Sequence, residues 1–154
     1  VRALCYMKML GGDGMRDAAQ TAVLNANYLK KLLEPHCDAA TPGLCMHEFV
    51  LTMEHLKKET GVSAMDVAKS MLDYGMHPPT MYFPLIVPEA LMFEPTETES
   101  KETLDWAAQT IAEILERAHT DPESLHAAPT RTPIRRPDEV RAARTPKLRY
   151  SFDA

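Results

Sequence analysis

The sequence predicts an α+β fold, with helices packed on one face of a small, mostly antiparallel sheet. Three observations lead to this prediction. Two long stretches have apolar residues at helical spacing, short aromatic or β-branched runs lie between them, and glycines or prolines mark their ends. A chain of 154 residues, 45% of them apolar and 25% charged, can build one core of its own. No apolar run approaches the roughly 20 residues of a membrane helix, so no membrane contact is expected.

The first helix is predicted from about Met15 to Leu33. Its apolar and small residues recur every three or four positions, Asp13 can cap its first turn, and Pro35 ends it. Three glycines between positions 11 and 14 break the chain ahead of this helix. The N-terminus has neither an initiator methionine nor the pattern of a signal peptide, so the chain is interpreted as a piece of a longer protein.

The next predicted elements are a strand at 48–53 and a short second helix. Ser63 and Asp66 have the spacing of a capping box, in which two side chains satisfy free amides at a helix start. Gly75 is expected to end this helix, because glycine readily takes the left-handed conformation found there. Two consecutive prolines at 78 and 79 then force an extended path.

Two further strands are predicted at 83–87 and 90–93, joined by a tight connection at Pro88. A second capping box, Thr96-Glu-Thr-Glu99, is expected to open the last helix. Beyond His119, repeated prolines predict an extended tail. The apolar stripe of the last helix consists of Leu104, Ala107, Ala108, Ile111, Ile114, Leu115 and Ala118.

The predicted organisation is a helix at 1–34, an α+β domain at 35–120 and a Pro- and Arg-rich tail at 121–154. Seven basic and two acidic residues lie between positions 129 and 149, a net charge of +5, and because the whole chain carries −5 the remainder carries −10. This asymmetry suggests that the tail lies along an acidic surface, such as that of a partner subunit. Nucleic acid is the alternative partner. Few aromatic residues lie among the basic ones and the domain is acidic overall, so no nucleic-acid binding is expected.

The three cysteines, Cys5, Cys37 and Cys45, indicate neither a disulfide framework nor a metal centre. Their number is odd and their spacing irregular, as is typical of a protein of the reducing cytosol. His36 and His47 lie near two of them in the sequence, but the paired Cys-x-x-Cys ligands of a structural zinc site are missing, so no metal is expected. A phosphate-binding glycine loop, a nucleophile elbow and a zinc-binding helix are also absent from the sequence.

The most unusual stretch is Tyr74-Gly-Met-His-Pro-Pro-Thr-Met-Tyr-Phe-Pro84, which combines a histidine, a threonine and three aromatic side chains with three prolines. Prolines lower the entropy cost of fixing a loop, so His77 and Thr80 could line a site. A rigid connector without chemistry is the alternative, and composition alone favours it. Glu94 and Thr96 also have two interpretations. They could face a cavity where a strand ends, or they could belong to a helix start, where acidic residues are placed favourably.

Five segments, in this order, carry a resemblance to a known family. They are Leu24-Asn-Ala-Asn-Tyr28, Leu44-Cys-Met-His-Glu48, Asp66-Val-Ala-Lys69, Asp73-Tyr-Gly-Met-His-Pro-Pro-Thr-Met-Tyr-Phe-Pro84 and Glu94-Pro-Thr-Glu-Thr-Glu-Ser-Lys101. Together they resemble glycine decarboxylase, the P-protein of the glycine cleavage system, over about residues 2–120. The tail is similar to the end of the second subunit in the two-subunit bacterial form. Met76 and Tyr82 depart from the family pattern of Phe and Ser, and the bulkier Tyr82 would narrow a cavity beside this loop.

The resemblance implies the C-terminal small domain of a fold-type-I enzyme dependent on pyridoxal phosphate. Such a glycine dehydrogenase (aminomethyl-transferring) decarboxylates glycine and passes the aminomethyl group to the lipoyl arm of the H-protein. The implied partners are subunit 1, the H-protein and the large domain of the same chain, in an oligomer of the bacterial cytoplasm. The cofactor-bearing lysine of the family lies in a motif that this chain lacks, so the fragment alone is expected to be inactive. A stand-alone interaction domain that kept this fold is the alternative.

In fold-type-I enzymes the C-terminal region closes the substrate cavity, and the resemblance implies the same role here. No catalytic residue is expected within the fragment. The residues expected to form the wall of the cavity are His77, Pro78, Thr80, Met81, Phe83, His47, Glu48, Glu94 and Thr96.

Overall fold

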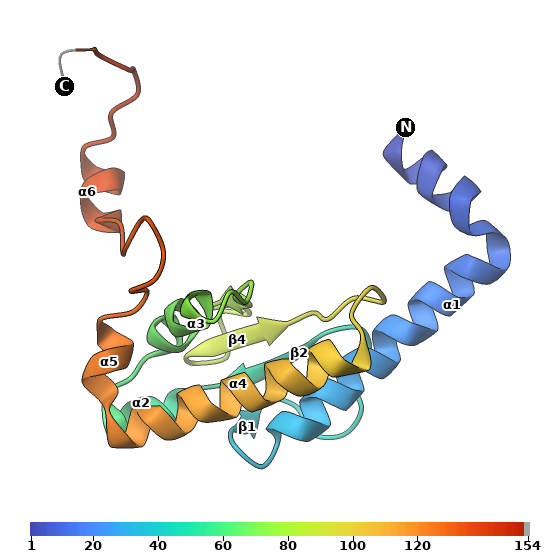
Figure 1. Ribbon diagram of the computed structural model, residues 1–154, viewed down its shortest axis with the longest axis horizontal. Coiled ribbons are helices and arrows are strands. Elements are labelled where there is room, and N and C mark those ends of the chain that lie inside the picture. Colours follow the sequence, from blue (N-terminus) through green and yellow to red (C-terminus); the bar gives the residue numbers. More distant parts are fainter. Residues whose placement is uncertain (153–154) are drawn as a thin grey trace.

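The computed structural model describes residues 1–152 and has the predicted α+β architecture (Figure 1). The helices are α1 (Arg2–Leu33), α2 (Glu54–Thr60), α3 (Ala64–Asp73), α4 (Lys101–Thr120), α5 (Pro122–His126) and α6 (Glu139–Arg144). The strands are β1 (Asp38–Ala39), β2 (Phe49–Thr52), β3 (Thr80–Met81) and β4 (Ala90–Phe93). None of the helices within residues 1–152 is both long and apolar enough to cross a membrane.

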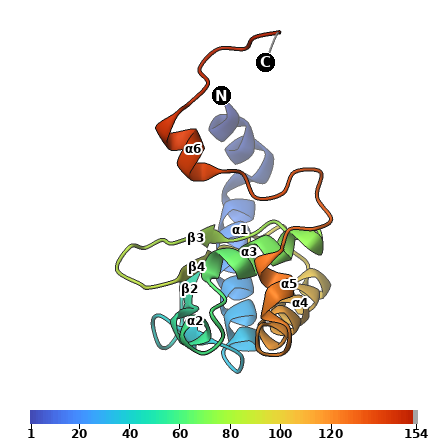
Figure 2. The same cartoon turned by 90° about the vertical axis from the view of Figure 1, so that its left-hand side faces the viewer.

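The four strands form one sheet in the order β1-β2-β4-β3, and every neighbouring pair is antiparallel. Phe49 pairs with Phe93 at one end of the two central strands, and their rings stack at 5.4 Å. The helices gather on one face of this sheet, as the end-on view shows (Figure 2). Burial alternates along β2, where Leu51 is buried and Val50 is half-buried, as expected when one face is covered. The predicted fold class is confirmed.

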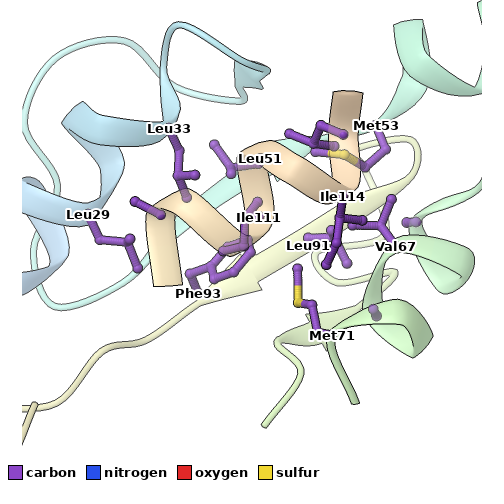
Figure 3. Close-up of a cluster of buried hydrophobic side chains, with 14 of the residues drawn as sticks. Leu29, Leu33, Leu51, Met53, Val67, Met71, Leu91, Phe93, Ile111 and Ile114 are labelled. Carbon is purple, nitrogen blue, oxygen red and sulfur yellow. The ribbon is translucent and has the colours of Figure 1, made fainter. Parts of the chain in front are cut away.

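The core fills the space between the sheet and three of the helices (Figure 3). Side chains from α1, α3 and α4 meet those of β2 and β4, so segments far apart in the sequence contribute to one cluster. Its labelled members are Leu29, Leu33, Leu51, Met53, Val67, Met71, Leu91, Phe93, Ile111 and Ile114. The stripe predicted on the last helix faces this core, where Ile111 and Ile114 are almost completely buried.

The first helix begins earlier than the sequence suggested, at Arg2 instead of Met15. It consists of two helical segments joined by a kink at Gly11, whose φ of 65° and ψ of −174° are not helical. Glycine tolerates this conformation because it has no Cβ, so the glycines redirect the helix instead of preceding it. The first half of α1 therefore leads away from the domain (Figure 1).

The capping box predicted for α3 is confirmed. The Ser63 hydroxyl accepts a hydrogen bond from the Asp66 backbone N–H, and the Asp66 carboxylate accepts one from the Ser63 N–H at 2.8 Å. Gly75 has a φ of 78°, the left-handed conformation expected just past the helix end. The short helix α2 and the two-residue strand β1 were not predicted.

The strand predicted at 83–87 is wrong, whereas its partner at 90–93 is β4. The strand that pairs with β4 is instead β3, just ahead of this stretch. Residues 83–87 form a turn between the two strands, and Leu85 and Ile86 are about as exposed as side chains can be. The prolines at 84 and 88 flank this turn, and neither has an N–H to donate to a strand ladder.

The capping box predicted at Thr96–Glu99 is also wrong, because α4 is capped by Ser100. The Ser100 hydroxyl accepts a hydrogen bond from the Thr103 N–H at 3.2 Å. The backbone carbonyls of Thr96 and Glu99 accept hydrogen bonds from the side chain of Asn25 on α1. A contact across 71 residues therefore shapes this turn, and local spacing could not reveal it.

The tail is not extended throughout, since it contains α5 and α6. Pro122 lies in the first turn of α5, where its missing N–H breaks no helical hydrogen bond. Asp121 and Asp138 cap the two helices through their side chains. Leu125 of α5 is fully buried, so this part of the tail belongs to the core.

Two carboxylates of α3 hold the next part of the tail against the domain. Arg136 lies 2.7 Å from Asp66, and its guanidinium also donates to the carbonyls of Ala128 and Leu125. Asp73, two turns farther along α3, accepts hydrogen bonds from the backbone N–H groups of Thr130 and Arg131. We call this arrangement the α3 clamp. It consists of Asp66 and Asp73 together with the tail residues 128–136, which include Arg136.

The α3 clamp favours the ionised form of both carboxylates. Burial raises the pKa of Asp66, but the hydrogen bonds from Ser63 and the Arg136 guanidinium outweigh burial and leave the pKa below its usual value. Burial also raises the pKa of Asp73, but the hydrogen bonds from the N–H groups of Arg131 and Thr130 outweigh burial. The pKa of Asp73 is therefore lowered as well. His126 is a second basic residue beside Asp66, with its Nδ1 3.4 Å from the carboxylate.

Candidate functional site

Three segments converge at one end of the sheet. The chain enters β2 and β3 at this end and leaves β4 there, because β4 is antiparallel to both neighbours. The pairing of Phe49 with Phe93 brings His47, just ahead of β2, close to Glu94, just after β4. The Nε2 atom of His47 lies 3.8 Å from a Glu94 carboxylate oxygen. Two residues predicted as part of a cavity wall, 47 positions apart, are thus neighbours.

Helix α1 fixes two of these segments through side-chain amides. Asn25 is buried and donates to the carbonyls of Thr96 and Glu99, at 2.8 and 3.1 Å. Asn27 holds Cys45 from both sides, since its oxygen accepts the Cys45 N–H and its nitrogen donates to the Cys45 carbonyl. The motif Leu24-Asn-Ala-Asn-Tyr28 therefore positions the segments that precede β2 and follow β4.

Two further polar residues of this helix, Tyr28 and Lys30, are structural as well. The ammonium group of Lys30 is buried and donates to the carbonyls of Thr41 and Gly43, at 2.9 and 2.6 Å. The Tyr28 hydroxyl donates to Asp105 of α4 at 2.5 Å. Hydrogen bonds from Lys101 and then from Tyr28 hold the pKa of Asp105 below its usual range.

A pocket of about 440 Å³ opens at this end of the sheet, between the connector 75–80, the end of β4 and the first half of α4. Apolar residues such as Phe93 and Ile111 form much of its wall. Its charged residues are Glu94 and Glu99, and among the described residues that line it none is Lys or Arg.

Four of the predicted wall residues line this pocket, namely His77, Pro78, Thr80 and Glu94. The other five predicted residues do not line it. His47 contacts its rim through Glu94, and Glu48 is half-buried just ahead of β2. Met81 packs against the core, Phe83 is exposed on the turn beyond β3, and the Thr96 hydroxyl pairs with that of Thr98.

The sequence analysis missed Trp106 and Glu99 as pocket residues. Trp106 is the single tryptophan of the chain, and it lies outside the apolar stripe of α4 with 43% of its surface exposed. A tryptophan on the polar side of an amphipathic helix was the available signal, since such large aromatic groups are usually covered.

None of the three cysteines lines this pocket. Burial, and then the Asp38 carboxylate, raise the pKa of the Cys37 thiol to about 12, so it stays protonated. It contacts the Leu33 carbonyl at 3.6 Å. Within residues 1–152, no three or more His, Cys, Asp or Glu side chains are grouped so that they could hold a metal ion.

Comparison with known proteins identifies the family. The family model for the C-terminal domain of glycine dehydrogenase matches residues 18–133. The chain belongs to this glycine dehydrogenase family. The family expected from the five ordered segments is thereby confirmed. The match begins in the middle of α1 and ends within the α3 clamp, so it covers the sheet and the pocket.

Two curated relatives align over almost all of the chain. A probable glycine dehydrogenase (decarboxylating) subunit 2 from Treponema denticola is 59% identical over 97% of this chain, which corresponds to 31% of the relative. A protein of the same name from Thermosipho africanus is 56% identical over 99% of the chain and 32% of the relative. This glycine dehydrogenase domain thus spans about a third of the length of these relatives.

A solved structure supports the same assignment. The chain superimposes with a TM-score of 0.61 on a crystal structure of glycine decarboxylase (P-protein) of the glycine cleavage system in inhibitor-bound form. The two are 25% identical, and the match covers 71% of this chain and 24% of the other. The glycine dehydrogenase domain therefore keeps its fold at much lower sequence identity than that of its bacterial relatives.

Proposed function

We propose that this chain is the C-terminal part of subunit 2 of a glycine decarboxylase. The whole enzyme decarboxylates glycine with pyridoxal phosphate and transfers the aminomethyl group to the lipoyl arm of the H-protein. The 59% identity to a probable subunit 2 over 97% of the chain is the observation that carries this proposal. Its partners are then subunit 1, the H-protein and the large domain of its own polypeptide. The three cysteines are all free, which supports a place in the reducing cytoplasm.

Pyridoxal phosphate supplies the electron sink for decarboxylation, and we infer that the large domain holds it. The pocket in this chain has two carboxylates and, among its described lining residues, no Lys or Arg side chain for a phosphate group. Among residues 1–152, Lys30 is the one buried lysine, and two backbone carbonyls bind its ammonium group. The donor set of this chain therefore does not fit the cofactor, and the isolated chain is inactive.

The pocket supplies part of the wall of the substrate cavity. His77 and Thr80 lie on a connector stiffened by the two prolines between them, and Glu94 faces the same pocket. The wall is open to the outside in the chain alone and is completed by the large domain. Its role is to orient the substrate and exclude water, with the reacting atoms held elsewhere.

Reconstitution tests the family activity. The full-length protein, its partner subunit and lipoylated H-protein are combined with pyridoxal phosphate, and carbon dioxide release from glycine is measured. The complete mixture is expected to release carbon dioxide and the chain of residues 1–154 alone is not. After borohydride reduction, mass spectrometry should find the cofactor label on the full-length protein and none on the isolated chain. An inactive complete mixture favours the alternative, a stand-alone interaction domain with this fold.

Substitution of the histidine tests the wall. In the full-length enzyme, His77→Ala should lower kcat/KM for glycine by about tenfold, the effect of losing roughly 1.4 kcal/mol of positioning. His55→Ala is the control, because His55 is an exposed histidine on α2 that does not line this pocket. Equal kcat/KM values for the two variants would show that His77 does not form part of the cavity wall.

A further inference from the structure

Beyond the α3 clamp, the chain leads away from its own domain (Figure 1). Every residue from 137 to 152 is exposed, and α6 has no buried residue. We call residues 137–152 the C-terminal arm. Three large apolar side chains near its end are almost fully exposed, with Leu148 at 87%, Tyr150 at 83% and Phe152 at 92% of their possible surface. Such a concentration of exposed apolar side chains marks a contact surface.

The end of the arm has the sequence pattern of a β-strand. From Lys147 to Phe152, basic or polar residues alternate with Leu148, Tyr150 and Phe152, which is the period of a strand with one apolar side. The rings of Tyr150 and Phe152 contact each other edge to face at 5.0 Å, so both lie on one side of the segment. Yet within residues 1–152 the sheet pairs no strand with this segment. The segment with this pattern therefore belongs to no sheet among the described residues.

The arm also carries four cations against two acidic residues, Asp138 and Glu139. Within residues 1–152, its cations Arg141, Arg144, Lys147 and Arg149 form no ion pair with a carboxylate. The carboxylates of α3 are already bound to the preceding part of the tail. A partner that covers the arm therefore needs apolar surface on one side and acidic groups on the other.

The direction of the arm indicates where that partner lies. The arm and the first half of α1 leave the domain on the same side, as both views show (Figures 1 and 2). That half of α1 also exposes apolar residues, including Leu4, Met7 and Met9. The relatives are about three times as long as this chain, and residue 1 is at the end of this helix. A domain joined to residue 1 would lie in the space between α1 and the arm.

We propose that residues 147–152 form an additional β-strand on an open sheet edge of the domain that precedes residue 1 in the full-length polypeptide. Leu148, Tyr150 and Phe152 cover apolar surface of that domain, while Lys147 and Arg149 face acidic residues. The added strand pairs its backbone groups with that sheet edge, and α6 serves as the spacer. The proposal rests on the proposed function only in that a large domain precedes this one. Nucleic acid is disfavoured as the occupant because the chain as a whole is acidic.

Photo-crosslinking in the full-length protein tests the occupant. The variant Tyr150→p-benzoylphenylalanine is assembled with the partner subunit, irradiated, digested and analysed by mass spectrometry. The expected crosslinks join position 150 to residues that precede Val1 in the same polypeptide. Crosslinks to the partner subunit, to a second copy or to nucleic acid would overturn the proposal, as would the absence of any crosslink.

Hydrogen exchange tests the strand itself. In the full-length protein the amides of residues 147–152 should exchange at least tenfold more slowly than in the chain of residues 1–154. The variant Tyr150→Ser/Phe152→Ser should lose this protection, whereas Ile134→Ser should keep it, because Ile134 is an exposed apolar residue outside the arm. Equal exchange in the long and short proteins would contradict the added strand. Both readouts are independent of glycine decarboxylation, so they can succeed or fail separately from the proposed activity.

Discussion

The two halves of the Pro- and Arg-rich tail differ sharply despite similar composition. Residues 128–136 are held by the α3 clamp, with Arg136 bound to Asp66 and two backbone carbonyls. Residues 137–152 have four basic residues against three in the clamped stretch, and yet every one of these sixteen residues is exposed. Composition therefore does not decide which part of such a tail packs against the domain. Two carboxylates on one helix decide it.

The spacing of these carboxylates explains why the clamp covers so short a stretch. Asp66 and Asp73 are seven residues apart and lie on the same side of α3, two turns from each other. They span about 10 Å of helix at 1.5 Å per residue, enough for a few residues of tail. The family match ends at residue 133, within this stretch. The clamp therefore marks the end of the domain, and the arm begins where it stops.

The largest effect is expected from Asp66→Ala, which removes the clamp and the capping box together. It leaves the Arg136 guanidinium without its carboxylate and the first amides of α3 without their cap. We expect a loss of about 3 kcal/mol in the free energy of unfolding, measured by urea titration of this chain. Glu116→Ala on the exposed side of α4 is the control and should change stability by less than about 0.5 kcal/mol. A loss as small as that of the control would mean that the clamp does not stabilise the domain.

Acidification should weaken the clamp in a defined direction. Burial raises the pKa values of Asp66 and Asp73, but their hydrogen bonds outweigh burial, so both pKa values are lowered in the folded chain. On acidification the unfolded chain therefore binds protons first, and the stabilisation is complete above the unfolded pKa of about 3.9 and lost below it. The free energies of unfolding of the native chain and Asp66→Asn/Asp73→Asn should differ by about 2 kcal/mol at pH 7 and converge as the pH falls through the folded pKa values of the two carboxyl groups. A constant difference across this range would exclude these carboxylates as its source.

A smaller effect is expected from Asp73→Asn alone. The amide keeps one oxygen acceptor but loses the charge that strengthens the hydrogen bonds from Thr130 and Arg131. The expected loss is about 1 kcal/mol, and amide exchange at these two residues should accelerate while that of α4 stays unchanged. Unchanged exchange at residues 130 and 131 would show that their N–H groups do not depend on the carboxylate.

The smallest effect is expected in the arm. In the chain of residues 1–154, Tyr150→Ser/Phe152→Ser should change the free energy of unfolding by less than about 0.5 kcal/mol, because both rings are exposed. A larger loss in the same urea titration would mean that the arm packs on its own domain, and the contrast with the clamp would disappear.

Local signals in the sequence predicted the elements that local contacts determine. The Ser63–Asp66 capping box, the strand around Leu51 and the stripe of α4 are all confirmed. The predictions failed where distant contacts decide. Asn25 bends residues 96–99 into a turn from 71 positions away. Arg136 reaches Asp66, and no periodicity in the tail indicates that contact.

The candidate site was predictable to a similar extent. The unusual composition of the connector after α3 singled out His77 and Thr80, and both line the pocket. Sheet pairing adds Glu94, and the resemblance had already suggested it. Phe83 was misplaced because its segment reads as a strand but forms an exposed turn. Trp106 was missed because the helical pattern of α4 places it on the solvent side. The pocket wall combines residues of several elements, and the pattern of one helix does not show this.

Occluding the pocket tests the proposal that it belongs to the glycine site of the assembled enzyme. Thr103 lines the pocket from the exposed side of α4, whereas Gln109 is equally exposed on the same helix but outside the pocket. In the full-length enzyme, Thr103→Trp should lower kcat/KM for glycine decarboxylation by at least tenfold with an unchanged unfolding midpoint, and Gln109→Trp should leave both values unchanged. Full activity of Thr103→Trp would show that this pocket is not part of the glycine site.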